Sequence, residues 1–259
     1  MQSNIKKSVE NRIGVLTLNR PGTRNALDDV LISELLEGIN AFSRNADIRV
    51  IILTGEGAAF CAGMNLDYLQ RSMAKSADEN IEDAKALQKL LLAVRQSRKT
   101  VIAMVNGPAM GGGCGLAAAC DFVFASQESA RFGVPEVRMG FVPAVILEFL
   151  VHRIGIGKTR EFVLQGAIVD STTAKSLGLV TETVSHDSLT TRVMEFANQL
   201  CSQTSASSSG LTKELLTRFD EMNRKDAQDF AANLNALIRK TDDFRRGIEA
   251  AINKEKIIW

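Results

Sequence analysis

The sequence lacks several features that define common classes of protein. Lysine and arginine total 31 against 30 acidic residues, and this formal net charge of +1 gives no bulk attraction to nucleic acid or to membranes. The four cysteines (Cys61, Cys114, Cys120 and Cys201) form no CxxC pair, so they are typical of reduced thiols in a reducing compartment. No unbroken apolar run approaches the roughly 18 residues that a membrane-spanning helix needs.

Two catalytic chemistries are also disfavoured by what is missing. His152 and His186 are the only histidines, and neither stands in a metal-ligand spacing, so no metal site is expected. No G-x-S-x-G motif is present, which argues against Ser-His-Asp hydrolysis. The first ten residues are polar and carry no signal-peptide core, so the expected location is the cytoplasm.

Three apolar runs indicate the fold class. Residues 50–53, 101–105 and 122–125 are almost continuously apolar, which is typical of strands buried on both faces of a parallel sheet. Helical spacing lies between them, at residues 64–72 and 79–96, and an earlier helical pattern covers residues 25–43. Two shorter strands are predicted at residues 4–10 and 12–18. The sequence therefore predicts an α/β spiral.

The second half of the chain is predicted to be helical after residue 142, apart from a brief strand at residues 179–184. The serine-rich residues 202–210 are interpreted as a hinge into a C-terminal helical segment, residues 211–254. We expect two units: a core at residues 1–200, and a segment at residues 201–259 that packs on the core or on a neighbouring subunit.

A glycine-rich turn at Gly111, Gly112 and Gly113 follows an apolar strand and leads into an alanine-rich helix. Glycine there permits a tight turn and leaves backbone N–H groups exposed at a helix N-terminus, which suits a phosphate or the oxyanion of a thioester. A second loop, residues 54–66, also joins a buried strand to a helix and could direct another N–H group to the same point. Residues 113–118 match the dinucleotide fingerprint G-x-G-x-x-A, but seven residues separate them from the strand, so the oxyanion interpretation is preferred.

Several motifs, in the right order from about residue 11 to the C-terminus, resemble the enoyl-CoA hydratase/isomerase (crotonase) superfamily. They are LNRP at residues 18–21, FCAGMNL at 60–66, VNGPAMGGG at 105–113, FGVPE at 132–136 and DFRRG at 243–247. The resemblance implies a crotonase-like ββα spiral with a C-terminal helical trimerisation segment. It also implies a homotrimer or a dimer of trimers (a hexamer), and a role in fatty-acid metabolism.

The resemblance assigns roles to individual residues. Backbone N–H groups of Met64 and Gly112 would form the oxyanion hole that polarises the thioester carbonyl. Coenzyme A enters as part of the substrate, with no separate cofactor, and its expected contacts are Arg24, Ala26, Ala62 and Lys256, the last one reaching a neighbour's site. The acyl pocket is expected to include Gly115, Tyr68 and Pro135.

The acid/base residues leave the reaction open. Two-glutamate hydratases of this family carry one glutamate soon after the glycine turn and one in the FGVPE motif; here the second is Glu136, whereas the first position is Gly115. Hydration needs a base for water and a proton for the α-carbon. We expect a 2-enoyl-CoA hydratase that uses Glu136, a lyase. The alternatives are a Δ3-Δ2 enoyl-CoA isomerase and a non-catalytic or RNA-binding relative of the fold. Glu148 is a further candidate carboxylate in an apolar helix.

Overall fold

The structure is a computed structural model that describes residues 3–259, except for the side chains of residues 220 and 221. The first two residues of the predicted core unit lie outside the described part. A six-stranded sheet with the order β1-β2-β3-β4-β6-β9 forms its centre, and a three-stranded sheet with the order β5-β7-β8 lies beside it. The strands are β1 (Ile5–Glu10), β2 (Ile13–Leu18), β3 (Val50–Gly55), β4 (Thr100–Val105), β5 (Ala109–Met110), β6 (Phe122–Ser126), β7 (Arg131–Gly133), β8 (Ile168–Asp170) and β9 (Glu182–Val184).

The central sheet confirms the predicted parallel arrangement. β1 and β2 pair antiparallel, and β2, β3, β4, β6 and β9 then follow one another in parallel. The strands β3, β4 and β6 are the three apolar runs of the sequence, and helices join them as crossover units. Because parallel strands all end at one edge, the loops that follow β3 and β4 are brought together there.

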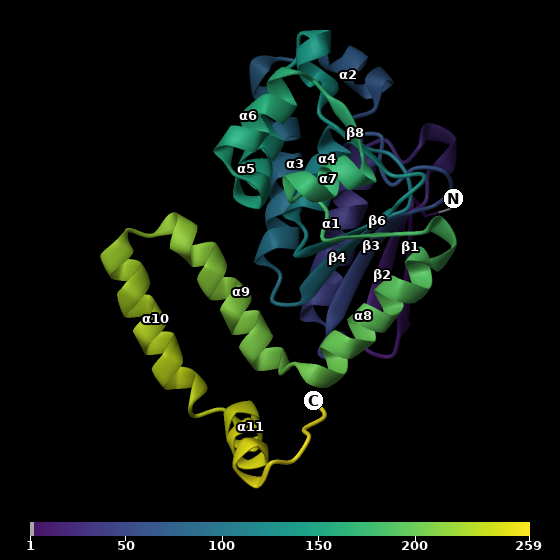
Figure 1. Cartoon of the computed structure of the whole chain (residues 1–259). Helices are drawn as coiled ribbons and strands as arrows, with labels where there is room; N and C mark the ends of the chain where they lie inside the picture. Colours follow the sequence, from purple (N-terminus) through teal and green to yellow (C-terminus); the bar gives the residue numbers. More distant parts are fainter. Residues whose placement is uncertain (1–2) are drawn as a thin grey trace.

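Helices cover both faces of the central sheet (Figure 1). The α1, α3 and α4 side holds the main core, and α8 buries Leu189, Val193 and Ala197 against the other face. The helices are α1 (Asp29–Arg44), α2 (Leu66–Ser72), α3 (Ala77–Gln96), α4 (Gly112–Ala119), α5 (Ala144–Ile154), α6 (Ile156–Leu164), α7 (Ser171–Leu177), α8 (Leu189–Gln203), α9 (Ala206–Glu221), α10 (Arg224–Ile238) and α11 (Asp242–Asn253), with 3-10 turns η1 (Pro21–Thr23), η2 (Pro135–Met139) and η3 (His186–Ser188).

The first helix begins later than the residues 25–43 pattern predicts. Asp28 caps α1 by accepting a hydrogen bond from the Leu31 N–H at 2.9 Å. Asn25 stays outside the helix, with φ +57°, because its side chain accepts from the Arg20 N–H and donates to the Ala59 carbonyl at 2.8 Å. These bonds tie the turn before α1 to the loop after β3, at the edge of the sheet where the strands end.

The serine-rich stretch does contain the turn into the C-terminal helices, but the predicted extent of nine residues is wrong. α8 runs to Gln203 and α9 starts at Ala206, with the Ser205 side chain accepting from the Ser208 N–H at 3.1 Å. The hydroxyls of Ser205 and Ser207 both donate to Asp243 Oδ2, at 2.6 and 2.7 Å. The chain turns only at residues 204 and 205, and the other serines of the stretch lie within α8 or α9.

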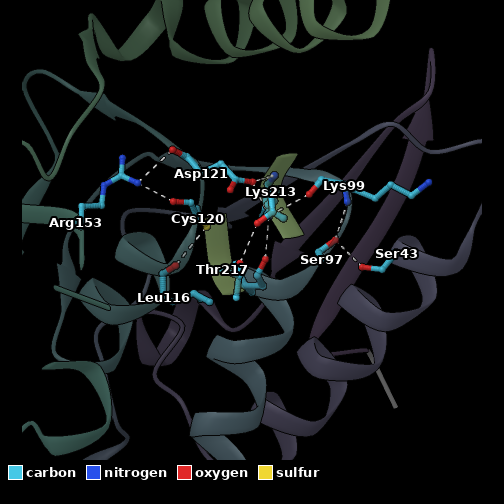
Figure 2. A network of polar contacts seen from close by, with 11 residues as sticks. Ser43, Ser97, Lys99, Leu116, Cys120, Asp121, Arg153, Lys213 and Thr217 are labelled. Atoms are coloured by element: carbon cyan, nitrogen blue, oxygen red, sulfur yellow. Dashed lines mark hydrogen bonds and ion pairs between the residues drawn. The ribbon is translucent and has the colours of Figure 1, made fainter. Parts of the chain in front are cut away.

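α9, α10 and α11 extend from the core as a separate arm (Figure 1). Lys213 of α9 attaches this arm to the sheet: its Nζ donates to Asp121 Oδ2 at 2.6 Å and to the Lys99 carbonyl at 3.1 Å (Figure 2). Arg153 donates to the carbonyls of Cys120 and Asp121 on the same side. None of the helices within residues 3–259 combines the length and the apolar character that would let it cross a membrane.

Candidate active site

The two glycine-containing loops predicted to converge do so. The Cys61 N–H donates to the Pro108 carbonyl at 3.1 Å, and the Met110 N–H donates to the Cys61 carbonyl at 2.9 Å, so the loop after β3 pairs with β5. A Cβ added at Gly113 would lie 2.3 Å from the Cys61 carbonyl oxygen. Only glycine permits this approach, which brings the N-terminus of α4 against the first loop.

Two backbone N–H groups are left free where these loops meet. Around Met64, the Leu27 N–H donates to the Gly63 carbonyl and the Asn65 N–H donates to the Leu27 carbonyl, both at 2.7 Å. Within the described residues, neither the Met64 N–H nor the Gly112 N–H donates to a protein acceptor. The two groups are neighbours, since a Cβ added at Gly63 would lie 3.6 Å from the Gly112 nitrogen. Gly112 opens α4, where free N–H groups and the helix dipole favour negative charge.

Glu136 lies directly on the glycine turn. Gly111 has φ +47° and donates its N–H to the Gly133 carbonyl at 2.8 Å, which ties the turn to the strand that leads into Glu136. A Cβ added at Gly111 would lie 2.6 Å from Glu136 Oε1. Two features therefore require glycine at position 111. The backbone has a positive φ, and the Glu136 carboxylate occupies the space that a Cβ would take.

The environment of Glu136 suits proton transfer. Glu136 is 8% exposed, and its Oε2 atom is buried with no hydrogen-bond partner among the described residues. Burial raises the pKa of this carboxyl group, although its own backbone N–H acts in the opposite direction. A carboxylate with a raised pKa and a free oxygen is a stronger base than a solvated one, and it can also return the proton.

Two cavities meet at Glu136. One, of about 470 Å³, is lined by Met64, Gly111 and Glu136 together with predicted residues Ala26, Ala62 and Pro135. The other, of about 430 Å³, is lined by Met64, Gly112 and Glu136 together with Tyr68 and apolar side chains of α3 and α5. The carboxylate and the free N–H groups therefore lie between two spaces, one on the side of Ala26 and one on the side of α3 and α5.

Two further predicted coenzyme A contacts, Arg24 and Lys256, line neither cavity of this chain. Arg24 is exposed at the turn before α1, and its carbonyl accepts from the Ala62 N–H at 3.0 Å, so it adjoins the first cavity without lining it. Lys256 follows α11, on the far side of the molecule from α2 (Figure 1). It lines neither cavity of its own chain.

Gly115 lies beneath the second cavity and not on its surface. A Cβ added there would lie 2.3 Å from Ile146 Cγ2 and 2.7 Å from Ile146 Cβ. Ile146 of α5 itself lines the cavity, so it fills the space in front of Gly115. The position at which two-glutamate relatives carry their other carboxylate is therefore closed by packing in this chain.

Other candidate groups are excluded from this chemistry. Glu148 is half exposed, accepts from Arg95 at 2.8 Å and lines neither cavity. Burial raises the pKa of Cys61 and of Cys114 to about 12, so neither thiol is a nucleophile near neutral pH. Among the side chains that the structure describes, those of residues 3–219 and 222–259, no group of three or more His, Cys, Asp or Glu is arranged to hold a metal ion.

Sequence reasoning missed a polar group beside Tyr68. Lys75 Nζ lies 2.5 Å from Asp83 Oδ2 and donates to the Tyr68 hydroxyl at 3.3 Å. Asp83 stands one helical turn before the buried Leu87 of α3, and both line the second cavity. Residues four apart lie on the same face of a helix, so the spacing from Asp83 to Leu87 in the sequence indicates that Asp83 faces inward.

Comparison with known proteins identifies the family of this chain. The family described as enoyl-CoA hydratase/isomerase matches residues 8–259. A "Probable enoyl-CoA hydratase" of Rhizobium meliloti is 33% identical over 95% of this chain and 94% of that protein, and the peroxisomal Delta(3,5)-Delta(2,4)-dienoyl-CoA isomerase of Arabidopsis thaliana is 29% identical over 97% and 94%. The crystal structure of an enoyl-CoA hydratase from Mycobacterium smegmatis superposes with a TM-score of 0.92, covering 100% of this chain and 99% of that one at 26% identity. The chain belongs to the enoyl-CoA hydratase/isomerase family.

Proposed function

We propose that this protein adds water across the double bond of a 2-enoyl-CoA thioester. The observation that carries the proposal is the buried, unpartnered oxygen of Glu136 beside the free N–H groups of Met64 and Gly112. The hydratase relatives, which match nearly the whole chain, support the same reaction.

The backbone N–H groups and Glu136 have separate roles in the proposed reaction. The thioester carbonyl accepts hydrogen bonds from the Met64 and Gly112 N–H groups, which stabilise the negative charge that moves onto its oxygen. Glu136 takes a proton from water while the water oxygen bonds to the β-carbon. The same carboxyl group then returns that proton to the α-carbon, and the enolate collapses to the thioester. One carboxyl group therefore serves as base and as acid.

The assay compares 2-enoyl-CoA and 3-enoyl-CoA thioesters with the purified protein. We expect hydration of the 2-enoyl thioester, seen as loss of its conjugated absorbance, and loss of about 10²–10⁴-fold in kcat for Glu136→Gln. Glu148→Gln is the matched control, because its carboxylate lines neither cavity, and it should retain wild-type kcat. Full activity of Glu136→Gln on every substrate that the wild type converts would refute the assignment.

Δ3-Δ2 enoyl-CoA isomerisation is the second candidate, and the closed space at Gly115 favours it. Double-bond migration needs one base that removes a proton and returns it further along the chain, and Glu136 alone supplies that. If the 3-enoyl thioester is converted and no hydration of the 2-enoyl thioester is seen, isomerase is the function.

We assign the first cavity to the pantetheine and nucleotide of coenzyme A, with Ala26 and Ala62 along its wall and Arg24 at its rim. The Lys256 that contacts coenzyme A in this cavity would then come from a second copy of the chain. Exposed Phe244, Ile248 and Ile252 recur every four residues on α11 and form an apolar stripe that suits such a contact. A trimer or a dimer of trimers by light scattering is the expected result. The four free thiols support a reducing, cytoplasmic location.

A further inference from the structure

The second cavity has one wall of unusual polarity. Most of its lining is apolar, from Leu87 of α3 to Ile146 of α5. The wall formed by α2 and the first turns of α3 instead presents Ser72, Asn80 and Asp83 beside Tyr68. These groups lie at the solvent-accessible edge of the cavity, where Asn80 is exposed and the Asp83 side chain is 26% exposed, so a substrate that covers them displaces water from any acceptor that the protein leaves unpaired.

Asp83 is charged and incompletely satisfied. Burial opposes its ionisation, but hydrogen bonds from Lys75 and Tyr68 outweigh this and lower its pKa. Lys75 uses Oδ2, and the Lys75 ammonium also lies over the Tyr68 ring, 4.8 Å from its centre. A carboxylate has about four acceptor positions, and Lys75 and Tyr68 use two of them. Positions remain for a further donor.

The neighbouring polar groups also have spare hydrogen-bonding capacity, most of it as acceptors. The Ser72 hydroxyl donates to the Leu69 carbonyl at 2.7 Å, and the Asn80 amide donates to the Ser72 carbonyl at 3.2 Å. The Ser72 hydroxyl oxygen and the Asp83 carboxylate keep acceptor positions only, and the Asn80 amide keeps one N–H and its carbonyl oxygen. Lys75, the cation of the group, is not among the described residues that line the cavity.

We propose that the preferred acyl group carries a hydrogen-bond donor, a hydroxyl, which it places on Asp83. This rests on the proposed use of a coenzyme A thioester, and it specifies the class of acyl chain. A hydroxyl donates to an acceptor position of the Asp83 carboxylate that Lys75 and Tyr68 do not use, whereas an alkyl chain covers that position without a hydrogen bond. A terminal carboxylate would face Asp83 as a like charge, so the cavity selects against it.

Binding measurements with saturated thioesters test this proposal independently of catalytic turnover. Saturated acyl-CoA thioesters from butanoyl to octanoyl are compared by calorimetry with their terminally hydroxylated and terminally carboxylated counterparts. At the chain length that reaches Asp83, the hydroxylated thioester should bind about tenfold more tightly than the alkyl one, as one hydrogen bond to a charged group allows. The carboxylated thioester should bind most weakly.

Variants identify the group responsible. Asp83→Ala should bring the ratio of hydroxyl to alkyl affinity close to one, whereas Glu82→Ala, an exposed carboxylate next to it on α3, should keep the wild-type ratio. Lys75→Met should also keep the preference for the hydroxyl, because the hydroxyl donates to Asp83. If Lys75→Met abolishes the preference while Asp83→Ala does not, the donor and acceptor have been assigned the wrong way round.

The outcomes distinguish the two proposals. If no chain length favours the hydroxyl, or if the carboxylated thioester binds best, this inference is wrong even when the plain 2-enoyl thioester is hydrated. If the hydroxyl is preferred in binding but no 2-enoyl thioester is hydrated, the acyl selectivity stands and the proposed reaction fails.

Discussion

The contact between Gly115 and Ile146 predicts a large penalty for a very small substitution. Gly115→Ala adds one methyl group, 2.3 Å from Ile146 Cγ2 and 2.7 Å from Ile146 Cβ. Both distances are shorter than carbon atoms tolerate, and α4 and α5 are packed against each other at this point, so side chains or backbone must shift. Overpacking of this kind costs about 1–3 kcal/mol.

A second glycine provides the matched control. Gly157 lies in α6 at an exposed position, and a Cβ added there meets nothing within 4 Å. Gly157→Ala gains only helix propensity, up to about 1 kcal/mol. The free energies of unfolding of the two variants should therefore differ by about 1–3 kcal/mol, which corresponds to about 2–4 °C in Tm for each kcal/mol in a chain of this size.

A double-mutant cycle tests the cause. Ile146→Gly removes both close atoms and leaves only the Ile146 Cα, 3.7 Å away at ordinary contact distance. Gly115→Ala should then cost much less in the Ile146→Gly background, with a coupling energy of about 1–3 kcal/mol from denaturant unfolding. If Gly115→Ala is as stable as Gly157→Ala, or if the coupling is below about 0.5 kcal/mol, Ile146 does not close this position and the reasoning fails.

Three further predictions follow from the site and its supports. Because burial raises the pKa of Glu136 in the folded state, this group favours the folded state at low pH and loses that contribution as the pH rises through the folded-state pKa. Glu136→Gln should therefore raise Tm by a few degrees at neutral pH and lose this advantage in acid; an unchanged difference between neutral and acidic pH in calorimetry would contradict it. Gly111→Ala should lower kcat by about 10²-fold or more, because its Cβ displaces Glu136 Oε1, while Gly178→Ala, also at positive φ but with open space around it, should lower stability and not kcat. Lys213→Met should cost about 1.5–3 kcal/mol of unfolding free energy, since Asp121 loses its cation (Figure 2), and exposed Lys225→Met should cost nothing measurable by urea unfolding.

The parts of the site that could be predicted are those fixed by local backbone requirements. Three consecutive glycines after a buried strand are explained by a positive φ at Gly111 and by the approach of Gly113 to Cys61. Such requirements involve only a few neighbouring residues, so they can be recognised as a local motif in the sequence. The parallel sheet was predictable for a similar reason, because burial on both faces leaves continuous apolar runs in β3, β4 and β6.

The rest depended on contacts between distant segments. The serines after α8 have the composition of a loop, but the hydroxyls of Ser205 and Ser207 donate to Asp243, 38 and 36 residues further along the chain. The strands β5, β7 and β8 contain two or three residues each, too few to show alternation. Lys75 and Asp83 pair across the turn between α2 and α3, and that turn is not defined by the helical pattern of either helix alone.

Ile146 links the number of catalytic carboxylates to the shape of the acyl cavity. The same side chain lies against Gly115 and lines the cavity in front of Glu136, so a second glutamate and the present cavity cannot coexist. Gly115→Glu alone should unfold or destabilise the chain, whereas Gly115→Glu with Ile146→Gly should fold and bring a second carboxyl group toward Glu136. Two neighbouring carboxylates cannot ionise independently, so the acid limb of the kcat profile should move to higher pH in that double variant. The hydration rate should also rise relative to isomerisation, because water then has a base and an acid. If the double variant folds and shows neither change, the space that Ile146 fills is not the place from which a second carboxylate would act.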